Sequence, residues 1–194
     1  TTDEQNVHHA AMIPPATESN VRISSSNLIT GLWFLGFCIL LIREIGSRWM
    51  LSRLIANSQP LHDSELLTLI AARQKQGFLK SPVRCIVTDA ELGPSSCGFW
   101  RPTILLPRSL WEDFDQKSRR AIVYHELEHI RRHDALLLSL SRIAIAVHWF
   151  NPLVYLITGR LRREIELAVD AATVAAFDEQ TRHHYGELLI QLSQ

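Results

Sequence analysis

The sequence has no excess of either charge, because 20 lysines and arginines balance 20 aspartates and glutamates over 194 residues. A nucleic-acid-binding domain needs a basic face, so this balance argues against direct nucleic-acid binding. Cysteine is also scarce: Cys38, Cys85 and Cys97 are an odd number, at spacings that form no zinc knuckle. Free thiols in a reducing compartment are expected instead of a disulfide framework.

The first apolar segment lacks the basic amino-terminal region and the small-residue cleavage site of a signal peptide. What it has is a run of 20 residues without charge, from Ile23 to Ile42. That is about the length a helix needs to cross a hydrocarbon core of roughly 30 Å. We predict a transmembrane helix over 23–42, with a buried core helix as the alternative. The polar stretch 1–22, which contains a Pro-Pro pair, is predicted to be a linker or loop.

Basic residues mark one side of this apolar run. Arg43, Arg48 and Arg53 follow it, whereas mainly acidic residues precede it. Basic flanks of membrane helices stay in the cytoplasm. The rest of the chain, 43–194, is therefore predicted to be a cytoplasmic domain.

The rest of the chain predicts a mainly α fold with a small β-sheet or hairpin. The predicted helices cover Leu61–Gln76 with a cap at Asp63, the segment after Asp115 or Ser118, Arg160–Phe177 and Thr181–Leu192. Apolar runs at 82–87 and 103–106, separated by turn residues, predict strands. An exposed edge of such a sheet could hold an extended peptide by strand addition, although a purely structural hairpin fits the sequence equally well.

A second apolar segment covers about 135–158, interrupted by Arg142, His148 and an Asn151-Pro152 pair. It could span the membrane, re-enter it or lie against it, and a soluble core hairpin is the alternative. Asn-Pro should break or kink a helix here. We predict an embedded or surface-lying hairpin.

The segment His125-Glu126-Leu127-Glu128-His129 forms an H-E-x-x-H motif. On a helix, positions i and i+4 share one face, so the two imidazoles can bind one metal ion. Glu126 lies beside them, where it can act as the general base that takes a proton from a water molecule at the metal. The motif is short and can occur by chance, so it indicates a metal site only if it lies on a helix and a third ligand is present.

Zinc in a peptidase usually takes three protein ligands and leaves one position to water. Glu166 is the predicted third ligand, because Glu166 and Asp170 form an E-x-x-x-D pair on one face of a predicted helix. Asp170 is predicted to accept a hydrogen bond from a ligand histidine and so orient its ring. Glu164 is the competing ligand, two residues back and on another face. If residues 135–158 crossed the membrane once, Glu166 would lie on the opposite side from the two histidines. A metal ion shared by all three residues therefore excludes a single membrane crossing by 135–158.

The sequence leaves the roles of several other polar residues open. Glu128 points away from the predicted metal face and is expected to be solvated. Asp134 could support a ligand, cap the next helix or pair with Arg131. A donor for the developing oxyanion is usually needed. His148 is the candidate donor, with Tyr155 and Tyr185 as further candidates.

The motifs together resemble a known family. YHELEHIRRHD, HWFNPLVYL and RREIELAVDAA, with the upstream G-x-x-x-P-x-I-x-x-P segment that begins at Gly98, occur in the order and spacing of membrane metallopeptidases related to bacterial β-lactam sensor-transducers, also called antirepressor peptidases. The match covers about Ser81 to Tyr185.

The resemblance implies a gluzincin-like zinc endopeptidase in the bacterial inner (cell) membrane, with its catalytic part facing the cytoplasm. It assigns one zinc ion to His125, His129 and Glu166, and catalysis to Glu126. It also implies signal transduction by self-cleavage or by cleavage of a transcriptional repressor, with a sensor domain elsewhere in the full-length chain.

The sequence departs from the family pattern in two places. Val169 stands where many relatives have cysteine, and the S-x-x-K motif of a penicillin-binding sensor does not occur. Sensing of β-lactams is therefore not expected from these residues. The alternative function is a non-catalytic membrane signal transducer that keeps the peptidase fold and binds a partner protein; the complete H-E-x-x-H and E-x-x-x-D motifs argue against it.

Overall fold

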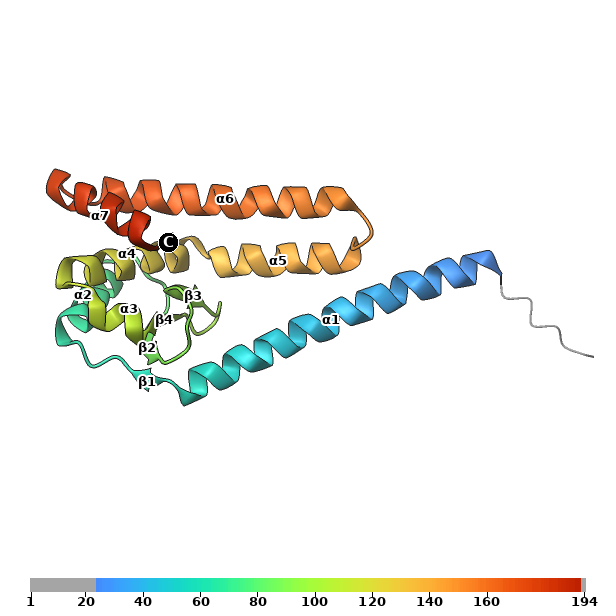
Figure 1. Cartoon of the computed structure of the whole chain (residues 1–194), viewed down its shortest axis with the longest axis horizontal. Coiled ribbons are helices and arrows are strands. Elements are labelled where there is room, and N and C mark those ends of the chain that lie inside the picture. Colours follow the sequence, from blue (N-terminus) through green and yellow to red (C-terminus); the bar gives the residue numbers. More distant parts are fainter. Residues whose placement is uncertain (1–23, 193–194) are drawn as a thin grey trace, which may run out of the picture.

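The structure is a computed structural model that describes residues 24–192, so the linker predicted over 1–22 lies outside the described residues. The described chain is mainly helical with one small sheet, as predicted (Figure 1). Its elements are α1 (Ser25–Asn57), β1 (Gln59–Pro60), α2 (Ser64–Lys75), β2 (Arg84–Thr88), β3 (Ser95–Cys97), β4 (Thr103–Pro107), α3 (Arg108–Asp113), α4 (Gln116–Arg132), α5 (Asp134–Val147), α6 (Pro152–Ala175) and α7 (Glu179–Leu192).

Helix α1 is the candidate membrane span. It continues without a break past Arg43 to Asn57, whereas the sequence predicted a helix over 23–42. It is long and apolar enough to cross a membrane, and its most apolar stretch has no buried residue. That exposure argues against the alternative of a buried core helix. Figure 1 shows most of α1 extending away from the sheet, on the side toward which the α5–α6 pair also extends.

The sheet has the strand order β1-β2-β4-β3. The hairpin alternative is wrong, because the two predicted strands, β2 and β4, run parallel, with Cys85 opposite Ile104. Parallel strands need a long crossover, and the chain between them contains β3, which pairs antiparallel with β4. All of β4, and β2 after Arg84, are buried, as is usual for parallel strands.

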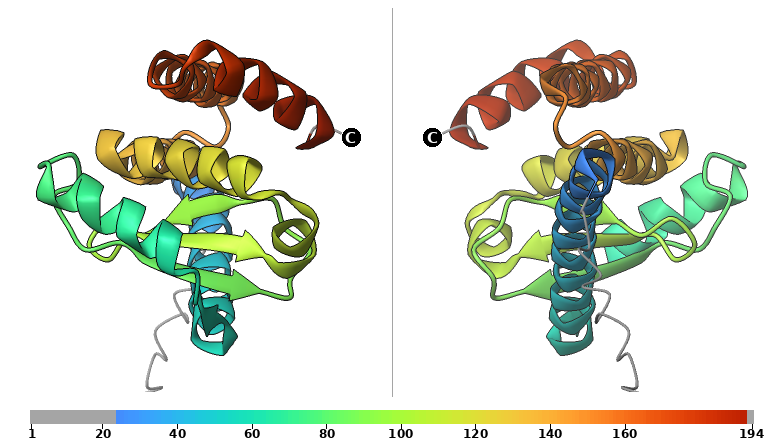
Figure 2. Two further views of the ribbon diagram at one scale, coloured as in Figure 1. Left: turned by 90° about the vertical axis from the view of Figure 1, so that its left-hand side faces the viewer. Right: turned by 90° about the vertical axis from the view of Figure 1, so that its right-hand side faces the viewer.

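Helix α4 lies between the sheet and the α6–α7 pair (Figure 2). Asp115 caps it by accepting a hydrogen bond from the Ser118 amide. Val123 and Leu127 are fully buried in the core that α4 shares with the sheet, α2 and α7. The helix therefore has one face fixed in the core while the histidines at 125 and 129 occupy another.

Helices α5 and α6 form the hairpin expected for the second apolar segment (Figure 1). Asn151 caps α6 through the Leu153 amide, and Pro152 occupies its first turn. Helix α6 therefore begins before Arg160, where the sequence predicted its start. The tip of the hairpin contacts α1: the Trp33 indole donates to the Val147 carbonyl at 3.0 Å, and the Trp149 indole donates to the Trp33 carbonyl at 3.2 Å.

Candidate metal centre

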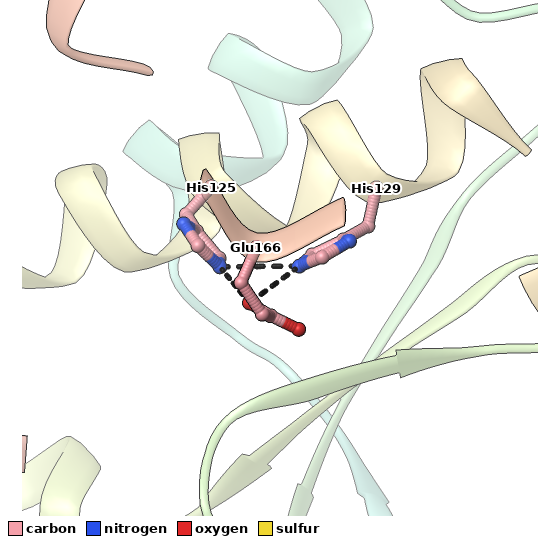
Figure 3. Close-up of side chains that lie close together, drawn as sticks. All are labelled: His125, His129 and Glu166. Atoms are coloured by element: carbon pink, nitrogen blue, oxygen red, sulfur yellow. Dashed lines mark hydrogen bonds and ion pairs between the residues drawn. The ribbon is translucent and has the colours of Figure 1, made fainter. Parts of the chain in front are cut away.

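The two histidines of the H-E-x-x-H motif lie one turn apart on α4 and face the same point (Figure 3). Their Nε2 atoms are 3.2 Å apart. Helix α6 brings the Glu166 Oε2 atom to 3.8 Å from His125 Nε2 and 3.6 Å from His129 Nε2. Within the described residues, this His-His-Glu group is the one cluster whose ligand atoms fit a metal ion, all lying within 4.8 Å of one another.

The spacing of these three atoms fits zinc. Ligands about 2.0–2.1 Å from a tetrahedral ion lie roughly 3.3 Å from one another. The separations of 3.2, 3.6 and 3.8 Å are close to that value. Two imidazoles and one carboxylate are also a common donor set of catalytic zinc sites.

The other ring nitrogen of each histidine has a partner. His129 Nδ1 lies 2.9 Å from Asp134 Oδ2, and the Asp134 side chain is almost fully buried. His125 Nδ1 lies 2.8 Å from the Tyr185 hydroxyl and 3.2 Å from Asp170 Oδ1. Tyr185 in turn donates to Asp170 at 2.8 Å. A carboxylate that accepts from Nδ1 leaves the Nε2 lone pair free, which is the arrangement a ligand histidine requires.

Glu126 is buried between α4 and the edge strand β3. Burial raises the pKa of its carboxyl group to about 7, and the charge of Glu166 adds to the rise. The charge of His129 and a hydrogen bond from Ser96 act in the opposite direction. A carboxyl group with a pKa near neutrality can both accept and return a proton at physiological pH.

The carboxylates around His129 favour positive charge at this point. Burial by itself would lower the pKa of His129, but the hydrogen bond with Glu166, the charge of Glu126 and the bond with Asp134 raise it to about 9. The pKa of His125 is lowered by burial and by the neighbouring His129. The same carboxylates that stabilise a proton here would stabilise a metal cation.

Several predicted positions differ from the structure. Glu128 is buried and pairs with Arg131 at 2.7 Å, so the expectation of a solvated side chain is wrong; the guanidinium compensates for its burial. Asp134, whose role the sequence left open, supports His129 and does not pair with Arg131. Glu164 is exposed and lies outside the His-His-Glu group.

The structure does not bring His148 to the site. It follows α5, whose 14 residues make a helix of roughly 21 Å that begins at Asp134, next to His129. His148 is exposed at the other end, so the predicted oxyanion donor is misplaced. Tyr155 is also in the hairpin, where its hydroxyl donates to the Trp149 carbonyl. Tyr185, the third candidate, faces the Nδ1 side of His125.

The comparison with known families agrees with this geometry. The model of the BlaR1 peptidase M56 family matches residues 2–194. This chain belongs to that family. The match confirms the resemblance that the motifs indicated, and it makes the chain a metallopeptidase-type protein of a membrane sensor-transducer family with a possible His-His-Glu metal site.

Two named bacterial proteins are similar to this chain. Regulatory protein BlaR1 of Bacillus licheniformis is 26% identical over 180 residues, which is 90% of this chain and 30% of the relative. The methicillin resistance mecR1 protein of Staphylococcus aureus is 24% identical over 125 residues, or 64% of this chain and 21% of the relative. The chain thus spans less than a third of the length of either relative.

Proposed function

We propose that this M56 family member is a zinc-dependent endopeptidase held in the membrane by α1. One observation carries the proposal: the donor atoms of His125, His129 and Glu166 converge at a spacing that suits a tetrahedral ion, with Glu126 beside them on the same helix. A protein that only transmitted a signal by binding a partner would not need a buried base next to an intact ligand group.

The residues of the site then divide the chemistry of peptide hydrolysis among them. Zinc, held by the two histidines and Glu166, would polarise the peptide carbonyl and lower the pKa of the attacking water. Asp134 fixes the His129 ring, and Asp170 with Tyr185 fixes the His125 ring. Glu126 takes a proton from the water and passes it to the leaving amine, a role that its position on α4 beside the two ligand histidines allows.

The substrate would lie along β3. This strand is at the edge of the described sheet, and its Ser96 side chain bonds to the base Glu126. An extended peptide that adds to this edge would run past the metal group with its backbone held by strand hydrogen bonds. An exposed edge of the sheet is a possible peptide site from the sequence alone; the edge proposed here is β3, a strand that the sequence did not predict.

The biological role follows from the family and its named relatives. Two of them are called a regulatory protein and a methicillin resistance protein. This supports a role in bacterial signal transduction, by self-cleavage or cleavage of a transcriptional repressor, under control of a sensor elsewhere in the full-length chain. The arginines at 43, 48 and 53 on α1 support an inner-membrane protein whose catalytic part, within 43–194, faces the cytoplasm.

The contacts between α1 and α5 support a membrane-embedded hairpin. Arg142 of α5 pairs with Glu44 of α1 at 3.1 Å, and Val147 accepts from Trp33 at the tip. The 11 residues between positions 33 and 44 correspond to about 16 Å of helix. If Glu44 marks the edge of a hydrocarbon core of roughly 30 Å, the tip reaches its middle.

The surface of the hairpin fits this depth. A Cβ at Gly36 would overlap the Trp149 ring, so glycine lets the tip lie against α1. The large apolar residues exposed toward the tip are Leu140, Ile143, Phe150, Leu153, Leu156 and Ile157. Because α5 is too short to cross the membrane and α6 returns alongside it, we infer a re-entrant hairpin in the cytoplasmic half of the bilayer.

Spin labels can test this depth. In a variant with the three native cysteines replaced and the protein in lipid bilayers, a nitroxide at Phe150→Cys should lie about 10 Å deeper than one at Leu140→Cys, by the helix rise between them. A label at Leu92→Cys, on the exposed surface near β3, is the water-exposed control. Equal and shallow depths at 140 and 150, measured from oxygen and nickel accessibilities, would show a hairpin lying on the surface.

The non-catalytic transducer is the remaining alternative, and a peptide library distinguishes the two functions. The reconstituted, zinc-loaded protein should produce new peptide termini, identified by mass spectrometry, that are absent when the metal is withheld. A transducer that kept only the fold would bind zinc and produce no new termini. That result would reject the endopeptidase.

A further inference from the structure

Two pockets of different character flank the metal group along β3. One has a volume of about 530 Å³ and includes His129, Cys97 and Gly98 in its wall. The other has a volume of about 480 Å³ and includes His125, Glu126 and Pro94. A peptide held on β3 would place side chains into both pockets, one on each side of the bond that lies at the metal.

The pocket beside His129 is basic, and we call it the basic pocket. Its cationic lining side chains are Lys80 and Arg131, the rings of His129 and His133 lie beside them, and none of its lining residues is a carboxylate. Arg131 is held in place by Glu128 and lies over the Phe78 ring at 5.3 Å. Lys80 is exposed at the pocket and forms no ion pair within the described residues. The uncompensated cation of this pocket is therefore Lys80.

The aromatic walls of the basic pocket shape it for an extended side chain. The rings of Phe99 and His133 meet edge to face with centroids 5.6 Å apart, and Phe78 lies on the same pocket. Phe99 is placed there by the turn at Gly98, whose φ of 83° is one that L side chains rarely adopt. A glutamate side chain suits such a pocket, because its methylene groups can pack against the aromatic rings and its carboxylate can pair with Lys80.

The pocket beside His125 is apolar. Leu92, Leu110, Ile122 and Leu189 line it, and Glu126 is its one charged residue. An acidic side chain here would face Glu126 and be repelled, whereas an apolar side chain would fit. The charge preference of the two pockets is therefore opposite.

The direction of β3 orders the two pockets along a bound peptide. The strand runs from Ser95, next to Pro94 in the apolar pocket, to Cys97 in the basic pocket. Antiparallel pairing is the more stable choice for an added strand. An antiparallel peptide would place its amino-terminal part over the basic pocket and its carboxyl-terminal part over the apolar pocket.

We propose that the basic pocket, through Lys80, selects substrates with an acidic side chain on the amino-terminal side of the scissile bond. This specificity rests on the endopeptidase function proposed above. It names the substrate class as extended peptide segments in which a glutamate or aspartate precedes the cleaved bond.

A binding experiment tests the pocket separately from the chemistry. Zinc-loaded Glu126→Gln protein is titrated with two fluorescent peptides of the same sequence that differ only in Glu or Lys at one central position, and affinity is read from anisotropy. The Glu peptide should bind more tightly. Adding Lys80→Glu should weaken its binding about tenfold, because a surface attraction becomes a repulsion, and should strengthen binding of the Lys peptide. Lys117→Glu, with the same change of net charge outside the pocket, should leave both affinities unchanged.

Equal affinities for the two peptides, or the same response to Lys80→Glu and Lys117→Glu, would overturn the proposal. A preference for acidic residues on the carboxyl-terminal side of the bonds cut in the peptide library would overturn the peptide direction. If binding shows the expected preference but the wild-type protein cuts no peptide, the pocket stands and the endopeptidase function fails.

Discussion

Glu126→Gln should retain zinc and lose cleavage by a factor of about 10²–10⁴, the usual contribution of a general acid or base. Glutamine has nearly the same shape as glutamate but cannot accept a proton, so the metal ligands stay in place while the proton transfer is lost. The measurement is kcat on a peptide cut by the wild type, with zinc content determined on the same sample.

Glu164→Gln is the matched control for this substitution. It makes the same chemical change at an exposed position outside the metal group. We expect it to cleave at the wild-type rate. If Glu126→Gln cleaves as fast as Glu164→Gln, Glu126 is not the base.

Glu166→Ala should weaken zinc binding by more than about 100-fold, since loss of a residue that only orients a ligand already costs 10–100-fold. Its Oε2 atom is the third donor of the group and comes from a different helix than the histidines. The measurement is a zinc titration against a competing chelator. Glu164→Ala should bind zinc like the wild type, because two residues correspond to about 200° around the helix and turn its side chain away.

The reverse order of these two variants would contradict the ligand assignment. It would mean that α6 presents Glu164 to the metal in the membrane-bound protein. Equal zinc affinity in both variants would place the third ligand outside this helix.

The metal group could be predicted from the sequence, because the spacing of residues along a helix determines which side chains share a face. His125 and His129 are four residues apart, and so are Glu166 and Asp170, so each pair had to share a helix face. The structure shows these faces opposite one another, with Asp170 at 3.2 Å from His125 Nδ1. Their roles in metal binding and catalysis remain predictions for the experiments above.

The substrate strand could not be predicted in the same way. Ser95–Cys97 is three residues long, lacks apolar alternation and lies between Pro94 and Gly98, so it reads as a loop. Its importance comes from tertiary placement, which brings Ser96 to Glu126. No local property of the sequence predicts the contact between Ser96 and Glu126.

The errors at Glu128 and His148 have physical causes as well. A glutamate next to the metal face is normally solvated, but here Arg131 on the next turn compensates for its burial. His148 resembled a donor because it is a lone histidine in an apolar segment. The length of α5 places it roughly 20 Å from the metal group, which a motif list does not convey.

The zinc dependence of cleavage by the wild-type protein is the most direct test of the central claim. The purified protein in lipid bilayers should contain close to one zinc ion per chain, lose peptide cleavage when a chelator removes the metal and recover it when one equivalent of zinc is returned. A protein that holds no zinc, or that cleaves equally well after the metal is removed, would contradict the account.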